Sequence, residues 1–168
     1  RVDRDRRLRE HERELRERNE RLRRLERINE VIRRIDAAVV DAESRSEVET
    51  AVCEELARSP LFSLAWVGRE DDGELAASAW AGDGDGYLDA IDRSLAGEGG
   101  PPAVRTARSG AVTYAPSVTD RLREEDWRVE AAARGFGSAL SVPVAGDDVT
   151  YGVLTLYAEE GDAFPDRI

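Results

Sequence analysis

The sequence lacks several residue types, and each absence limits what the protein does. Its 168 residues include no lysine, no methionine, one cysteine, Cys53, and one histidine, His11. A lone cysteine forms neither an intramolecular disulfide nor a cysteine-based metal cluster. A lone histidine leaves nothing for a histidine-ligated zinc site or a Ser/His/Asp triad. We therefore expect no enzymatic activity, no metal site, no identifiable cofactor and a reducing, cytoplasmic environment.

Long apolar runs are also missing. No run approaches the roughly 20 residues that a membrane-spanning helix requires, and no signal peptide opens the chain. We expect no association with a membrane. Because the first residue is Arg1 and the last residues are "AFPDRI", we expect the chain to be a piece of a longer protein.

Negative charge dominates most of the chain. Residues 1–30 carry twelve arginines and nine acidic residues, so the net charge of -11 leaves -14 on residues 31–168. A surface covered in carboxylates stays hydrated in concentrated salt, which screens its self-repulsion, and it is typical of a halophile's protein. Nucleic acid needs a basic footprint that this portion lacks, so we expect these residues to make no nucleic-acid contact.

Residues 1–27 predict a long helix, because they contain no Gly or Pro. Leucines recur there at seven-residue spacing: Leu8, Leu15 and Leu22. This spacing favours a parallel dimeric coiled coil, and Asn29 falls in the same series, where an Asn fixes register. The seam is imperfect, since His11 and Arg18 occupy the intervening positions that should be apolar. The alternative is a solvated single helix.

The next stretches predict a helix and a hairpin. A second helix begins at a cap, Ser44 or Ser46, and ends at Ala57, with Cys53 in its apolar stripe as a core residue. The stretch "SPLFSLAWVGREDDGELAASAWAG" predicts two strands, because Asp-Gly separates two apolar runs.

Shorter elements follow. "YLDAIDRSL" predicts a short helix, another helix begins after Pro102 and ends at Gly110, and "AVTYA" predicts a strand. A helix near Trp127–Arg134 and two strands within residues 134–160 complete the pattern. The predicted order is α-α-β-β-α-α-β-α-β-β, with five strands in one mostly antiparallel sheet.

The last two predicted strands carry the phrases "GSALSVPV" and "YGVLTLYA". Together with the element order, they resemble the GAF domain, a sensory relative of the PAS fold, over about residues 28–164. The resemblance implies an α+β, GAF/PAS-like fold with helices on both faces of the sheet and a ligand pocket on one face. It divides the chain into a signalling helix, residues 1–27, and a GAF-like domain, residues 28–168, without the family's usual C-terminal helix.

The Arg-rich helix, the acidic domain and the stretch from Ile28 to Asp71 also resemble haloarchaeal regulators of the bacterio-opsin activator type. Those proteins combine PAS and GAF modules with a helix-turn-helix that binds DNA. The resemblance implies a role in signal transduction and transcription regulation. It also implies that any DNA binding belongs to a domain outside these residues.

Aromatic side chains are the candidate walls of the implied pocket, together with one strand serine. The candidates are Trp66, Trp80, Tyr87, Tyr114, Trp127 and Ser138. Aromatic residues are also common in the core of a small domain, so that alternative stays open. Side chains alternate along a strand, so at most one of Ser138 and Ser141 faces the pocket. Gly137 and Gly152 indicate either a close approach of backbone or ligand, or a bend of the strand.

Several activities of the family do not fit these residues. Members that bind cyclic nucleotides carry an Asn-Lys-Phe-Asp-Glu motif, and this chain has no lysine. Members that attach a bilin use a Cys, and Cys53 is poorly placed for this. Members that reduce free methionine sulfoxide work through several cysteines. The carboxylates of Glu124, Glu125 and Asp126 are interpreted as a solvated loop rather than as acid/base groups.

The expected function is therefore that of a non-catalytic sensory module. It would bind an unidentified small molecule and transmit the signal through a homodimeric N-terminal helix. The alternative is a domain without a ligand that serves as a dimerisation spacer between other modules.

Overall fold

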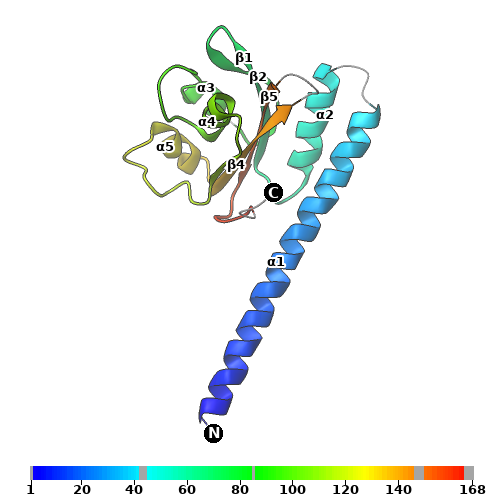
Figure 1. The fold of residues 1–168 in the computed structure, drawn as a ribbon, viewed down its shortest axis with the longest axis vertical. Helices are drawn as coiled ribbons and strands as arrows, with labels where there is room; N and C mark the ends of the chain where they lie inside the picture. The colour runs from blue at the N-terminus through cyan, green and yellow to red at the C-terminus, as the bar shows by residue number, and fades with distance from the viewer. Residues whose placement is uncertain (1, 42–44, 85, 146–149, 165–168) are drawn as a thin grey trace.

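The computed structural model describes residues 2–41, 45–84, 86–145 and 150–164 (Figure 1). All the predicted elements occur in the predicted order. The helices are α1 Val2–Asp41, α2 Arg45–Arg58, α3 Tyr87–Ala90, α4 Pro102–Ser109 and α5 Asp126–Ala133. The strands are β1 Leu64–Asp71, β2 Glu74–Gly82, β3 Thr113–Ala115, β4 Ser138–Ala145 and β5 Thr150–Ala158.

The five strands form one sheet in the order β2-β1-β5-β4-β3, and its strand pairings are antiparallel. The two phrases quoted above therefore form β4 and β5 in the interior of the sheet. The β1–β2 hairpin turns at Asp72 and Gly73, both with positive φ, as the "DDG" signal predicted. A bulge between Val67 and Gly68 shifts the register of this hairpin.

Helices cover both faces of the sheet, which confirms the predicted α+β fold (Figure 1). Side chains alternate along each strand, so Trp66, Val153 and Tyr157 point to one face while Val67 and Leu156 point to the other. The first face lies under α3, α4 and α5, and we call it the roofed face. The second packs against α2 and is the α2 face.

Helix α1 is continuous across residue 27 and reaches Asp41. Its N-terminal part extends away from the sheet, while its C-terminal part lies beside α2 (Figure 1). The boundary at residues 27 and 28 and the coiled coil both stay predictions. Among the described helices, none is both long and apolar enough to cross a bilayer.

Two glycines, Gly152 in β5 and Gly137 just before β4, allow neighbouring backbone to come close. A Cβ atom on Gly152 would lie 2.6 Å from the carbonyl oxygen of Gly68, and one on Gly137 would collide with the carbonyl oxygen of Glu159. A side chain at either position would push the neighbouring chain away. The sequence left open whether backbone or a ligand comes close to these glycines, and in the structure it is backbone.

Candidate functional site

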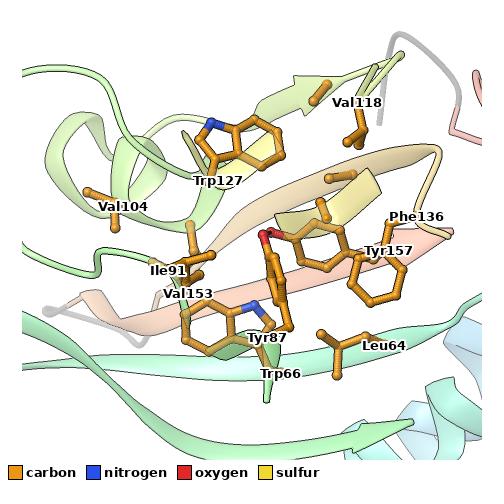
Figure 2. Close-up of a cluster of buried hydrophobic side chains, with 14 of the residues drawn as sticks. Leu64, Trp66, Tyr87, Ile91, Val104, Val118, Trp127, Phe136, Val153 and Tyr157 are labelled. Atoms are coloured by element: carbon orange, nitrogen blue, oxygen red, sulfur yellow. Dashed lines mark hydrogen bonds between the residues drawn. The ribbon is translucent and has the colours of Figure 1, made fainter. Parts of the chain in front are cut away.

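The roofed face encloses a cluster of aromatic rings (Figure 2). We call it the aromatic core, and its members are Trp66, Tyr87, Trp127, Phe136 and Tyr157, all buried. The rings of Phe136 and Tyr157 stack with centroids 4.9 Å apart, and Tyr87 meets both edge-on. These rings fill the space where the family resemblance implies a pocket.

Polar atoms are buried inside this cluster. The hydroxyls of Tyr87 and Tyr157 share a hydrogen bond of 2.6 Å. Burial raises the pKa of Tyr157 above its usual value, and burial followed by the neighbouring Tyr157 raises that of Tyr87. The indole N–H of Trp66 is buried and has no hydrogen-bond acceptor among the described residues. An unpaired buried donor costs free energy, so it marks a place in the core where an acceptor would be stabilised.

Three of the six predicted site residues, Trp66, Tyr87 and Trp127, come together in the aromatic core. Trp80 lies opposite Trp66 on the edge strand β2, where it is 60% exposed. It lines a pocket of about 220 Å³ with Ala77, Leu88 and the glycines of residues 82–86. Trp80 therefore belongs to the rim of the domain rather than to its interior.

The other two predicted residues belong to the α2 face. Tyr114 packs against the cluster on that face, with its ring edge-on to Phe164 at 6.2 Å. The hydroxyl of Ser138 donates to the carbonyl of Glu160 at 2.6 Å. Ser141 is the serine that alternation directs to the roofed face, and its hydroxyl is 2.9 Å from that of Thr155.

Sequence reasoning did not single out two members of the aromatic core, Phe136 and Tyr157. Tyr157 is four residues beyond Val153 on β5, so the period-two pattern of a strand places both on one face and could have identified it. Phe136 lies between α5 and β4, where the sequence has no periodic signal, and only the folded chain brings its ring onto Tyr157.

Cys53 is fully buried on the α2 face, which confirms its assignment to the core. Burial is the main cause that raises the pKa of its thiol to about 12, and the charges of Glu49 and Glu54 act in the same direction. The thiol is thus protonated and a poor nucleophile near neutral pH.

An open groove of about 920 Å³ lies outside the roofed face, between residues 90–92, 98–101 and 124–130. Its lining is acidic, but the described residues contain no group of His, Cys, Asp and Glu arranged to hold a metal ion. The prediction of a solvated loop holds for Glu124, whereas Asp126 is exposed but is the first residue of α5. It is wrong for Glu125, whose carboxylate is only 13% exposed and pairs with Arg105 at 3.2 Å.

The sheet order and the helices on both faces define the chain as an α+β domain. A family model described as "GAF domain" matches residues 42–168. The chain therefore belongs to the GAF-domain family, as its sequence phrases predicted.

Among known proteins, the chain is similar to a candidate transcriptional regulator of Haloferax volcanii. The two are 31% identical over 162 residues, which is 94% of this chain and 26% of the relative. The chain thus spans about a quarter of that regulator's length.

Solved structures share the fold. A candidate GAF sensor protein of Burkholderia vietnamiensis superposes with a TM-score of 0.65 at 14% identity, covering 85% of this chain and 84% of that one. The free methionine-R-sulfoxide reductase of Neisseria meningitidis, solved with its substrate, has a TM-score of 0.59 at 16% identity, covering 82% and 77%. At these identities the likeness concerns the fold alone. Family membership and the regulator relative together support a sensory or regulatory role.

Proposed function

We propose that the chain is a non-catalytic sensory module of a transcription regulator, which dimerises through α1 and passes changes in the sheet domain along that helix. The observation that carries the proposal is a row of exposed leucines on α1: Leu8 at 57%, Leu15 at 46% and Leu22 at 56%. A stripe of leucines at heptad spacing is buried best against the same stripe of a second copy.

Charges beside this stripe favour a parallel pair in register. With the leucines at the a positions, Arg7 of one protomer faces Glu12 of its partner, and Arg21 faces Glu26. Opposite charges at these flanking positions set orientation more than they add stability, because each exposed pair contributes at most about 1 kcal/mol. Arg18 and His11 at the d positions make the seam weak, which suits a helix that changes arrangement.

The coupling follows from the way α1 enters the domain. The helix is unbroken from the leucine stripe to Asp41, beside α2. Helix α2 in turn packs Cys53 and Leu56 onto the sheet. A signal transmitted by this route requires a ligand or partner to bind two arrangements of the domain unequally.

Two functions of the aromatic core compete, ligand binding and a purely structural role, and each is supported by one observation. The unpaired indole N–H of Trp66 favours a small molecule that brings a hydrogen-bond acceptor into the aromatic core. The rings that fill this core favour the alternative, a dimerisation spacer without a ligand. A ligand would have to displace at least one ring, since the rings are in contact.

Native mass spectrometry of chain purified from a high-salt host, sprayed from concentrated ammonium acetate, tests both parts. We expect a dimer, and an added mass that denaturation removes would identify a ligand. Dimer without added mass would favour the spacer. A monomer at tens of micromolar would refute dimerisation through α1.

Matched variants locate the interface. Leu15→Gln removes one leucine of the stripe. Glu20→Gln also introduces a glutamine, but on the opposite side of α1, and Glu and Gln have similar helix propensities. We expect the first to weaken the dimer about tenfold or more and the second to leave it intact, because only Leu15 loses buried apolar area. Equal effects of the two variants would contradict a leucine seam.

A further inference from the structure

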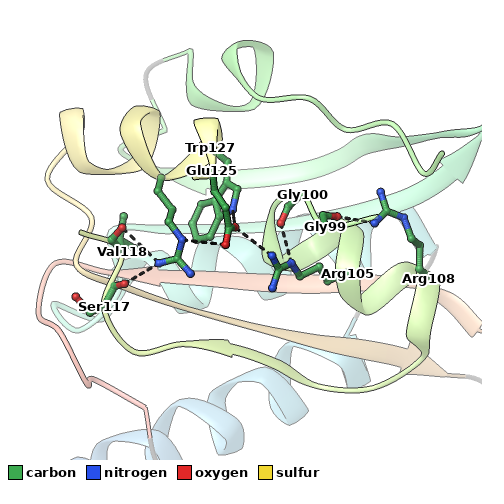
Figure 3. Close-up of polar contacts among 9 residues, drawn as sticks. Gly99, Gly100, Arg105, Arg108, Ser117, Val118, Glu125 and Trp127 are labelled. Atoms are coloured by element: carbon green, nitrogen blue, oxygen red, sulfur yellow. Dashed lines mark hydrogen bonds and ion pairs between the residues drawn. The ribbon is translucent and has the colours of Figure 1, made fainter. Parts of the chain in front are cut away.

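One carboxylate connects the two longer helices that cover the roofed face (Figure 3). Glu125 immediately precedes α5, and its Oε2 atom accepts the indole N–H of Trp127 at 2.5 Å. The same oxygen is 3.2 Å from Arg105 on α4, and Oε1 is 3.5 Å from Nε of Arg128. Two guanidinium groups and one indole therefore converge on a carboxylate that is largely removed from water.

The arginines of α4 also hold a glycine-rich loop, residues 94–100. Arg105 donates to the carbonyl of Gly100 at 3.1 Å. Arg108 donates to the carbonyls of Leu95 at 2.9 Å and Gly99 at 2.5 Å. Gly99 and Gly100 have positive φ. The start of the loop is held by backbone hydrogen bonding, since the N–H of Leu95 donates to the carbonyl of Gly73 at 2.9 Å, and the arginine contacts hold its glycine-rich end.

Beyond Glu125, Arg128 connects α5 to the segment after β3. Its guanidinium donates to the carbonyl of Ser117 at 2.7 Å and lies 4.7 Å from the ring centre of Trp127. We define the roof as α4, α5 and residues 94–100. One series of polar contacts crosses it, from the loop through α4, Glu125 and α5 to residue 117.

Trp127 connects the polar contacts of the roof to the aromatic core. Its N–H binds Glu125 on the outside, beside the open groove, while its ring is buried in the aromatic core. The position of this ring is therefore coupled to the carboxylate. The strands beneath are held by backbone hydrogen bonds, whereas the two helices of the roof are only eight residues long and too short to be stable alone.

We propose that Glu125 is a latch that holds the roof closed over the aromatic core, and that loss of its charge opens the roof while the sheet and α2 stay folded. Local opening of this kind is expected where side-chain contacts rather than backbone ladders supply the stability. The latch rests on the roof contacts alone and does not depend on dimerisation through α1.

Hydrogen exchange of the full chain, followed by mass spectrometry, tests the latch. In Glu125→Gln we expect the amides of residues 94–100 and 126–133 to exchange about tenfold faster or more, since a hydrogen bond to a charged group is worth at least that factor. The amides of β1 and β5 should exchange at the wild-type rate. A uniform acceleration over roof and sheet, or an unchanged roof, would overturn the proposal.

Glu130→Gln is the matched control. Glu130 lines the same groove and loses the same charge, but its ion pair with Arg134 at 2.8 Å lies within one turn of chain. We expect wild-type exchange in residues 94–100. If this control accelerates the loop as much as Glu125→Gln does, general loss of negative charge is the cause and the latch is refuted.

A second variant tests the latch by changing the α4 partner of Glu125. Arg105→Gln removes the cation that faces Glu125. The Arg105 side chain is more exposed than that of Glu125, so this variant should disturb folding less than Glu125→Gln does. Acrylamide quenching supplies an independent measurement in chains that also carry Trp80→Phe, because the remaining Trp66 and Trp127 are both buried. We expect Arg105→Gln to raise quenching at least twofold. Quenching equal to that of Trp80→Phe alone would overturn the latch.

Discussion

The two faces of the sheet are covered in different ways. The α2 face is covered by a 14-residue helix with an apolar stripe, and its buried side chains are mostly aliphatic. The roofed face is covered by three short helices and a glycine-rich loop, and its interior contains aromatic rings and buried polar atoms. A long helix satisfies most of its own backbone groups, whereas short helices and loops depend on side-chain contacts.

This difference indicates which contacts would have to break for each face to open. On the α2 face, opening would separate a complete helix from the sheet and expose its apolar stripe. On the roofed face, opening would break the contacts of Glu125, Arg105 and Arg108 and would also expose the apolar side chains that α4 and α5 bury against the aromatic core. Under the proposed function, a signal would be received on the roofed face, where polar side-chain contacts hold the covering elements, and would be passed to α1 from the α2 face.

The largest expected effect concerns the polar contact that fixes α2. Glu49 accepts from Arg69 at 2.8 Å and from the hydroxyl of Ser78, and so ties α2 to both strands of the first hairpin. We expect Glu49→Gln to lower the free energy of unfolding by about 2 kcal/mol, because hydrogen bonds to a charged group are lost. Urea unfolding followed by circular dichroism measures it.

The control for this prediction is Glu54→Gln on the exposed side of the same helix, which we expect to change stability by less than about 0.5 kcal/mol. If the two variants were equally stable, α2 would be held by its apolar stripe alone, and the contrast between the faces would become sharper.

The next effect concerns the tyrosine pair of the roofed face. Tyr157→Phe leaves the hydroxyl of Tyr87 buried without its partner, so we expect a loss of about 1–2 kcal/mol. Adding Tyr87→Phe removes the stranded hydroxyl and should restore part of this loss. A double-mutant cycle from urea unfolding measures the coupling. Strictly additive losses would mean that water reaches these hydroxyls, and that the roofed face is less closed than its packing indicates.

The smallest effect is a pH dependence from the α2 face. The pKa of the Cys53 thiol rises from 9.0 to about 12 on folding, so above pH 9 the unfolded chain loses this proton first. Stability from the buried neutral thiol is present below pH 9 and is lost as the pH rises toward 12. By pH 10 the loss should reach about 1 kcal/mol.

Cys53→Ala removes the titrating group and is the control for this pH dependence. The difference in unfolding free energy between wild type and Cys53→Ala should be constant from pH 7 to 8.5 and should shrink between pH 9 and 10. A difference that stays constant up to pH 10 would show that the thiol is not desolvated in the folded state.

Much of the fold followed from the sequence because its signals are local. The "DDG" turn, the proline at the start of α4 and Gly110 at its end depend on φ preferences of the residues themselves. The period of seven in α1 and of two in the strands depends on backbone geometry alone. The order of the elements and the α+β class could therefore be predicted before any contact was known.

The composition of the site was decided by tertiary structure. Trp66 and Trp80 face each other across one hairpin, yet β1 is interior and β2 is an edge, so one ring is buried and the other exposed. Likewise, Glu125 differs from its acidic neighbours because Arg105, which belongs to a different helix, meets it in the folded chain. Sequence determined which residues form each element, because propensity is local; tertiary structure determined which rings and charges meet, because those contacts join residues far apart in the chain.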